Sequence, residues 1–141
     1  MPAEIIVVAA ILRDENGRIL CALRNPVGSR PNLWEFPGGK LEPGETATQA
    51  LQRELMEELG CTVETTGDIF VESCHAYEDI SIRLLAMPCT LQSGQPRPLE
   101  HSALLWLPAA ALASLVWAPA DLPIVSKLLQ EAVPEDSSRQ A

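Results

Sequence analysis

The chain has 141 residues, a formal net charge of -9 at pH 7 and a hydrophobic content of 47%. This length suits one ordinary domain, and the apolar content lies in the globular range, so a largely disordered chain is excluded. The negative charge argues against a nucleic-acid polymer as partner, because proteins hold such polymers through basic surfaces. An acidic protein can still bind a polyphosphate where divalent cations lie between the two sets of negative charges.

The cysteines and the apolar run near the N-terminus indicate the cellular compartment in which we expect the protein. The four cysteines are Cys21, Cys61, Cys74 and Cys89. They are widely spaced and form no C-x-x-C pair, which indicates neither a zinc site nor a dithiol redox motif. The run 5–12 follows Glu4, lacks a basic flank and is too short to span a bilayer, so we interpret it as a buried strand. These features favour a cytoplasmic protein without a membrane partner.

In chain order, the first β-prone runs are residues 5–12 and 19–23. Asn16 and Gly17 lie between them and supply the positive φ angles of a tight turn, so we expect a hairpin. Residues 25–39 then combine prolines and glycines with one short apolar run. We expect this segment to be an irregular loop with a functional role.

A helix is predicted over residues 46–59. Thr46 and Gln49 form a capping box at its start, and Gly60 can adopt the left-handed conformation that ends a helix. The apolar face repeats every four residues, at Leu51, Leu55 and Leu59.

The second half alternates β-prone and helical segments. Strands are expected within 62–74, 80–89 and 104–106, a turn at 77–79, and helices near 108–115 and 120–132. Mixed strands with a central and a C-terminal helix predict an α/β fold, an α/β/α sandwich around a mixed β-sheet. We expect one domain over residues 1–133 and a disordered polar tail over 134–141.

Three carboxylates converge on one side of the predicted central helix. Glu54, Glu57 and Glu58 lie at i, i+3 and i+4, within an arc of about 100° beside the leucine face. They repel one another and crowd the helix end where the dipole disfavours negative charge. Mg²⁺ or Mn²⁺, which prefer oxygen ligands, would remove both penalties. The alternative is a solvated acidic face with ordinary pairing of Arg53 and Glu57.

The spacing around this helix matches a known motif. Gly39, five residues, Glu45, seven residues and then the run 53–61 fit the pattern G-x5-E-x7-R-E-U-x-E-E-x-G-U at every fixed position. With residue frequencies of about 5 to 10%, such a match arises by chance in about one window in 10⁸. The chain therefore resembles the Nudix hydrolase family, and only Cys61 departs from it, where the family prefers an aliphatic residue.

The resemblance implies a Nudix fold with a loop, helix and loop that carry the site. It assigns Mg²⁺, or alternatively Mn²⁺, to the three helix carboxylates, the Gly38 carbonyl and Glu100. Glu45 and Arg53 would hold the motif together, with Gly39 and Gly60 shaping its backbone. The implied catalytic residues are Arg53, Glu54, Glu57, Glu58 and Glu100. Either Glu54 or Glu100 is the general base, and the plain alternative for Glu100 is a surface residue.

The implied reaction is attack of a metal-activated water on a phosphorus of a diphosphate linkage, which releases a nucleoside monophosphate and pyrophosphate from a triphosphate. The segments 33–40 and 117–123 resemble the MutT-like branch, which includes oxidised-guanine triphosphatases and CTP or 5-methyl-dCTP pyrophosphohydrolases. In that branch the residue at Asp121 and the backbone near Phe36 bind the base, and the expected role is removal of noncanonical nucleotides. The alternative for Asp121 is a cap of the last helix.

Two cations are implied as further substrate-binding residues. Arg24 would reach a phosphate, or would instead form an exposed salt bridge, and Lys40 belongs to the segment that resembles the MutT-like branch. The partner is a small nucleotide, and the oligomeric state is expected to be a monomer or homodimer.

Two other functions stay open. One alternative substrate is ADP-ribose, but the subgroups that cleave it carry a proline at a set distance after the motif, and this chain has none at that distance. Another is a dinucleoside polyphosphate, since hydrolases of these compounds carry a Tyr near the place of Tyr77. A noncatalytic nucleotide-binding module usually accompanies loss of the motif glutamates, and all of them are present here.

Overall fold

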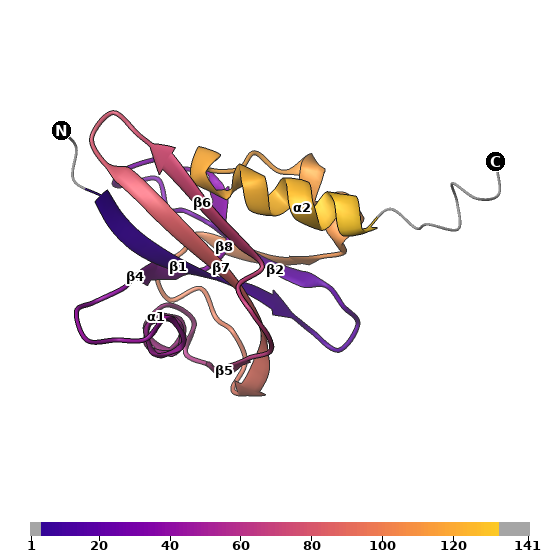
Figure 1. Ribbon diagram of the computed structural model, residues 1–141. Coiled ribbons are helices and arrows are strands. Elements are labelled where there is room, and N and C mark those ends of the chain that lie inside the picture. Colours follow the sequence, from indigo (N-terminus) through magenta and orange to yellow (C-terminus); the bar gives the residue numbers. More distant parts are fainter. Residues whose placement is uncertain (1–3, 133–141) are drawn as a thin grey trace.

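Strand β1 runs through the middle of a mixed sheet that has one helix on each face (Figure 1). The computed structural model describes residues 4–132, so the predicted disordered tail lies outside the described residues. The strands are β1 (Glu4–Arg13), β2 (Ile19–Leu23), β3 (Trp34–Glu35), β4 (Gly38–Lys40), β5 (Thr62–Thr65), β6 (Val71–Ala76), β7 (Ser81–Ser93) and β8 (Ala103–Leu107). The helices are α1 (Ala47–Leu59), α2 (Leu122–Ala132) and the 3-10 helices η1 (Ala109–Ser114) and η2 (Pro119–Asp121).

The sheet combines parallel and antiparallel pairs. β1 is parallel to β7 from the Glu4–Ser81 pair to the Arg13–Thr90 pair. On its other edge β1 pairs antiparallel with β4 and, at Arg13, with β2. β2 continues to β3 and β8, while β5 and β6 both pair with β7. This arrangement confirms the predicted mixed sheet.

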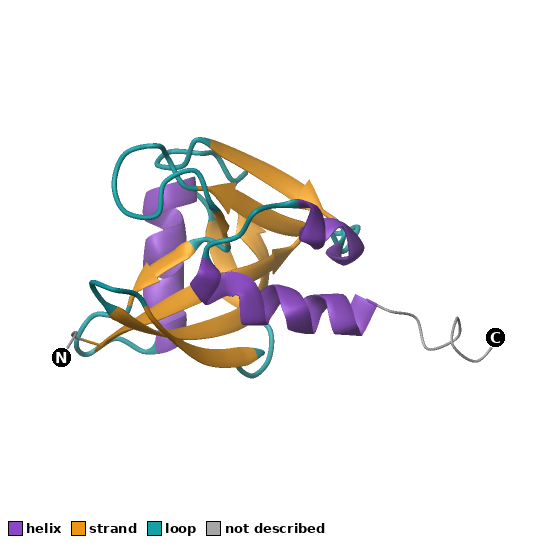
Figure 2. Cartoon of the chain, turned by 90° about the horizontal axis from the view of Figure 1, so that it is seen from above, coloured by secondary structure: helices purple, strands orange, loops and turns teal. Residues whose placement is uncertain are grey.

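The side chains of β1 alternate between two cores. Val8, Ala10 and Leu12 pack in the cluster that includes α1, whereas Ala9 and Ile11 pack in the cluster that includes α2. The two helices cover opposite faces and run in different directions across the sheet (Figure 2). Because both faces are covered, the strand is a continuous apolar run without polar alternation.

The ends of α1 follow from its local sequence. Thr46 Oγ1 accepts from the Gln49 amide at 3.1 Å, and Gln49 Oε1 accepts from the Thr46 amide at 2.9 Å, which confirms the capping box. Gly60 ends the helix in the left-handed region with φ of 70°. Leu51, Leu55 and Leu59 are fully buried, as their spacing predicts.

Two local expectations were wrong. Only Gly17 of the predicted turn pair has positive φ, because the Asp14 carboxylate accepts from the amides of Asn16 and Arg18 and folds the connection differently. Within the segment expected to be loop, 25–39, residues 34–35 form strand β3 and residues 38–39 belong to strand β4. Glycine at position 38 lets β4 lie against the Val8 backbone.

The segment predicted as strand over 62–74 divides into β5 and β6, with residues 66–70 between them. The described cysteines Cys21, Cys61, Cys74 and Cys89 are all free thiols. Among residues 4–132, no helix is both long and apolar enough to cross a membrane.

The α1 core contact can be tested by truncating one leucine. Leu55→Ala removes a fully buried side chain and should lower the free energy of unfolding by about 2–5 kcal/mol. The matched control is its neighbour Met56, which is 47% exposed, so Met56→Ala should change stability by less than ~1 kcal/mol. Urea unfolding compares the two, and equal losses would contradict the assignment of the buried face.

Candidate active site

Arg53 on α1 joins the helix to the segment that precedes it. Its Nε and Nη2 donate to the two Glu45 carboxylate oxygens at 2.7 and 3.0 Å. The same Nη2 donates to the Lys40 carbonyl at 2.9 Å, and Nη1 donates to Glu54 Oε1 at 2.8 Å. The bond from Arg53 lowers the pKa of the Glu45 carboxyl to about 2. Arg53 thus fixes the end of β4, the loop before α1 and one face of the helix relative to each other.

Gly38 and Gly39 stand where the backbone of β4 meets two neighbours. A Cβ on Gly38 would overlap the Val8 carbonyl group, and a Cβ on Gly39 would overlap the Glu54 carboxylate. Neither glycine has a positive φ, so the requirement here is space and not backbone conformation. The missing side chain of Gly39 lets the Glu54 carboxylate lie directly on β4.

The three helix carboxylates differ in their surroundings. Glu57 is exposed, whereas Glu54 and Glu58 lie at the edge of the core. Burial raises the pKa of Glu54 despite its contact with Arg53. Burial and repulsion from nearby carboxylates, including Glu35 and Glu54, raise the pKa of Glu58 to about 9. Glu58 Oε1 is buried and has no hydrogen-bond partner among the described residues.

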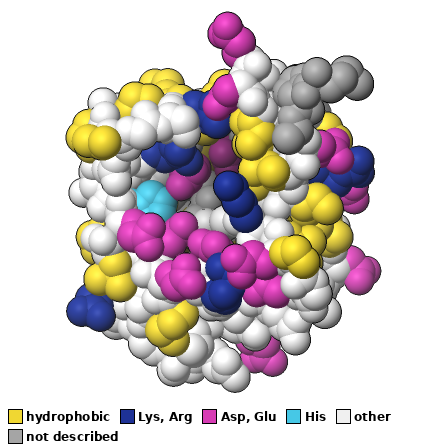
Figure 3. Space-filling view, turned by 90° about the vertical axis from the view of Figure 1, so that its left-hand side faces the viewer, with side chains coloured by type: hydrophobic (Ala, Val, Ile, Leu, Met, Phe, Trp, Pro, Cys, Tyr) yellow, Lys and Arg dark blue, Asp and Glu magenta, His cyan; other side chains and the backbone are white. Residues whose placement is uncertain are grey.

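These three carboxylates can be compared with the ligands that a divalent cation prefers. Across residues 4–132, no group of three or more His, Cys, Asp or Glu side chains is placed so that it could hold a metal ion by itself. The donors nevertheless suit a hard cation, because they are oxygens, and one of them is the orphaned Oε1 of Glu58. Mg²⁺ usually keeps several waters and takes few protein ligands, so an open arrangement is consistent with it. Figure 3 shows acidic side chains gathered beside a hollow that also exposes basic groups.

Glu35 on β3 joins three segments beside these carboxylates and was missed by the sequence reasoning. Its Oε1 accepts from Arg24 Nη1 at 2.7 Å, and its Oε2 lies 2.8 Å from His101 Nε2. The His101 side chain is only 6% exposed. His101 lies 66 positions from Glu35, so no local spacing could have revealed the pair. The signal that the sequence offered was the carboxylate itself, which lies inside the predicted loop 25–39.

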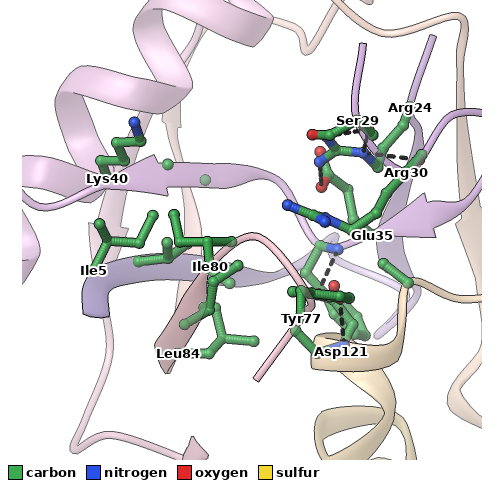
Figure 4. A pocket seen from close by; sticks show the side chains of 18 of the residues that line it. Ile5, Arg24, Ser29, Arg30, Glu35, Lys40, Tyr77, Ile80, Leu84 and Asp121 are labelled. Carbon is green, nitrogen blue, oxygen red and sulfur yellow. Dashed lines mark hydrogen bonds and ion pairs between the residues drawn. The ribbon is translucent and has the colours of Figure 1, made fainter. Parts of the chain in front are cut away.

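A cavity of about 350 Å³ extends from this region toward the start of α2. Asp121 and Tyr77 line one end, and Lys40 lies at the other (Figure 4). Phe36 also lines the cavity and contacts Asp121 through its backbone amide. Phe36 stacks on buried Trp117 with ring centroids 4.6 Å apart, which makes this end rigid and apolar. Such a space, with apolar walls and few polar groups, has the character of a small-molecule site.

Asp121 is a buried acid at the base of the cavity. It is 7% exposed, and its Oδ1 accepts from the Phe36 amide at 3.3 Å. Its hydrogen bond therefore goes to Phe36, and the described contacts give no support to the alternative of a cap on α2. Burial, with a smaller contribution from Glu35, holds the pKa of Asp121 well above its ordinary range. The protonated acid carries one donor and one acceptor.

The structure places the other predicted residues as follows. Arg24 lines the cavity, but its guanidinium donates to Glu35 and to the carbonyls of Ser29 and Arg30. This contact set resembles the salt-bridging alternative more than a free phosphate ligand. Glu100 is exposed before β8 and lines a smaller hollow together with Glu58.

The Arg53–Glu45 pair generates a pH prediction. The Glu45 pKa is lowered from 4.5 to about 2, so the ionised carboxylate stabilises the fold above pH 4.5 and this contribution disappears as pH falls through about 2. Glu45→Gln should lower stability at pH 7, and its deficit relative to the unchanged protein should shrink between pH 4.5 and pH 2. Urea unfolding across this range measures it, and a deficit independent of pH would contradict the assignment.

Comparisons with known proteins agree with this arrangement. The family model for the NUDIX domain matches residues 4–128. The CTP pyrophosphohydrolase of Escherichia coli (strain K12) is 38% identical over 132 residues, which are 92% of this chain and 96% of that protein. The putative 8-oxo-dGTP diphosphatase 2 of Mycobacterium tuberculosis (strain ATCC 25618 / H37Rv) is 39% identical over 122 residues, 84% of this chain and 82% of that protein.

Solved structures show the same similarity. The E. coli ORF135 protein has a TM-score of 0.74 at 37% identity, covering 96% of each chain. The DNA mismatch repair protein MutT (family Nudix hydrolase) of methicillin-resistant Staphylococcus aureus 252 has a TM-score of 0.73 at 42% identity, covering 94% of this chain and 100% of that chain. The match therefore extends over the whole described fold.

Proposed function

Because this chain belongs to the NUDIX family of hydrolases, we propose that it is a Mg²⁺-dependent pyrophosphohydrolase of nucleoside triphosphates. It would convert a triphosphate and water into the monophosphate and pyrophosphate. Relatives named for CTP and for 8-oxo-dGTP, similar over most of their length, support a nucleotide substrate. The role that follows is removal of noncanonical or pyrimidine nucleotides from the cellular pool.

One observation carries the proposal: the Oε1 of Glu58 is buried, has no hydrogen-bond partner among residues 4–132 and lies near other carboxylates. Glu58 lines a hollow that shares Glu35 with the cavity that ends at Asp121. A buried polar atom without a partner costs free energy, and repulsion from neighbouring carboxylates adds to that cost. A cation and a polyphosphate would compensate both, whereas a merely solvated acidic surface would leave no such buried atom. The arrangement therefore suits the reaction better than it suits a passive surface.

Different residues in and beside the cavity would bind the cation and the phosphates. Glu54, Glu57, Glu58 and the Gly38 carbonyl would hold Mg²⁺, or Mn²⁺ in its place. When bound, the cation would polarise the phosphoryl oxygens and neutralise the leaving pyrophosphate. Lys40 at the rim would add positive charge for the phosphates.

The water needs a group that can accept its proton, and Glu100 suits this better than Glu54. The Glu54 carboxylate is already bound to Arg53 at 2.8 Å. The Glu100 side chain forms no hydrogen bond among residues 4–132 and lies on the same hollow as Glu58. We therefore assign the general base to Glu100.

The base end of the substrate would meet Asp121. A protonated carboxyl places one donor beside one acceptor, which complements the ring nitrogen and amino group of cytosine. It can also donate to the carbonyl oxygen of an oxidised purine. An oxidised guanine likewise presents a carbonyl oxygen beside an N–H group, so both bases fit the donor and the acceptor of the acid.

The reaction is tested by pyrophosphate release with Mg²⁺ over CTP, dCTP, 5-methyl-dCTP, dGTP, 8-oxo-dGTP, ADP-ribose and a dinucleoside polyphosphate. A preference for one triphosphate supports the proposal, and the base it carries settles the specificity. Release from none of the triphosphates would refute the proposed reaction. Activity confined to the diphosphate-bridged compounds would retain the hydrolase and replace its substrate.

The carboxylate assignment is tested by Glu57→Gln. Glu57 is exposed, so the change should spare the fold while it reduces turnover by about 100-fold or more. The matched control is Glu64→Gln, the same substitution at an exposed residue of β5. Steady-state kinetics and thermal unfolding measure both variants, and retained activity in Glu57→Gln would remove Glu57 from the metal site.

The role of Asp121 is tested by comparing Asp121→Ala with Asp121→Asn. Asparagine also offers a donor and an acceptor, so it should preserve most of the base preference, whereas alanine should reduce kcat/KM for the preferred nucleotide by about tenfold relative to the others. The measurement is kcat/KM over the same nucleotide panel. An equal loss for every nucleotide would instead make Asp121 structural.

A further inference from the structure

Arg30 lies in the loop between β2 and β3 and reaches the nucleoside end of the cavity. Its guanidinium carbon lies 3.9 Å above the centroid of the Tyr77 ring, and Nη1 is 3.3 Å from Asp79 Oδ1. Figure 4 shows the side chain extending from the loop toward Tyr77 across the cavity. Arg30, Tyr77 and Asp79 all line this space. The β2–β3 loop and the β6–β7 turn thus meet where the Arg30 guanidinium stacks on the Tyr77 ring.

The donors of Arg30 are largely unused. Its side chain makes one hydrogen bond among residues 4–132, the long contact to Asp79, although a guanidinium carries five N–H groups. Arg24 differs, because it spends its donors on Glu35, Ser29 and the Arg30 carbonyl. Of these two arginines lining the cavity, Arg30 is therefore the one with donors to offer a ligand.

The position of Arg30 is held against a backbone preference. Its φ is 52°, in the left-handed region that is sterically unfavourable for a residue other than glycine. Arg24 Nε donates to the Arg30 carbonyl at 3.1 Å and stabilises this conformation. Strained residues of this kind persist where the surroundings fix them, often at ligand sites.

Tyr77, on which the guanidinium stacks, is also held in place. The Tyr77 hydroxyl accepts from the Ala120 amide at 2.9 Å, and Ala120 directly precedes Asp121. The ring that supports Arg30 is therefore anchored to the same turn that carries the buried acid. One face of Tyr77 is covered by the guanidinium, so that face cannot stack on a base.

We propose that Arg30 is a specificity-determining residue, which donates hydrogen bonds from its planar guanidinium to a carbonyl or ring-nitrogen acceptor of the substrate base. This inference rests on the proposed nucleotide substrate and adds a second base contact across the cavity from Asp121. Tyr77 orients the guanidinium plane, and Arg24 orients the loop. Arginine suits the task because its fork matches paired acceptors, which a lysine ammonium does not.

The test is binding of CMP, UMP, AMP and GMP by isothermal titration calorimetry with Mg²⁺ present. Monophosphates have no diphosphate linkage to cleave, so binding is measured apart from turnover. The variants are Arg30→Ala and Arg30→Lys, and the control is Arg83→Ala, which removes a partly exposed arginine that pairs with Glu4 and Glu72.

The unchanged protein and Arg83→Ala should share one order of affinities. Arg30→Ala should weaken binding of the preferred monophosphate by about tenfold and bring the four affinities together, and Arg30→Lys should restore little of the preference because it supplies charge without the planar fork. Equal weakening of all four ligands by Arg30→Ala, or no change, would overturn the proposal. So would full restoration by lysine, or an unchanged protein that binds all four monophosphates equally or binds none.

These results stay separable from the proposed reaction. Failure of the unchanged protein to release pyrophosphate refutes the reaction. Retained base discrimination in Arg30→Ala, in a protein that does release pyrophosphate, refutes only the role of Arg30.

Discussion

The arrangement of the carboxylates depends on the ion pairs of Arg53. One guanidinium binds Glu45, Glu54 and the Lys40 carbonyl at 2.7 to 3.0 Å. Each partly exposed pair of this kind is worth little stability alone, typically less than about 1 kcal/mol. Its main effect is geometric, because the bonds fix the direction of Glu54 and the path of the chain from β4 into α1. The capped, leucine-anchored helix supplies the rigid support on which this network acts.

Glu35 connects the two ends of the cavity. It pairs with Arg24 and His101, and its charge contributes to the raised pKa values of both Glu58 and Asp121. A cation bound at the helix carboxylates would offset part of this negative field. Glu35 therefore links the region of Glu58 electrostatically to the region of Asp121. Under the proposed function, a divalent cation would offset the repulsion between the acidic chain and an anionic substrate.

Local patterns predicted the parts of the fold that depend on local physics. The capping box, the Gly60 stop and the fourfold leucine spacing determined α1, and the uninterrupted apolar run determined β1. The motif spacing indicated the carboxylates, but Glu35 and Arg30 act through partners distant in sequence, so no spacing revealed them. The turn before β2 differs from the predicted one, because the Asp14 carboxylate accepts hydrogen bonds from the amides of Asn16 and Arg18. Residue propensities for turns do not include such a side-chain contact.

The most direct measurement is Mn²⁺ binding to the unchanged protein and to Arg53→Gln, with free Mn²⁺ counted by electron paramagnetic resonance and folding checked by circular dichroism. The account predicts that Arg53→Gln remains folded and binds Mn²⁺ about 10- to 100-fold more weakly, because the Glu54 carboxylate loses its orientation. Equal affinities in the two folded proteins would contradict the central claim that the Arg53 network organises the carboxylates that we propose as metal ligands.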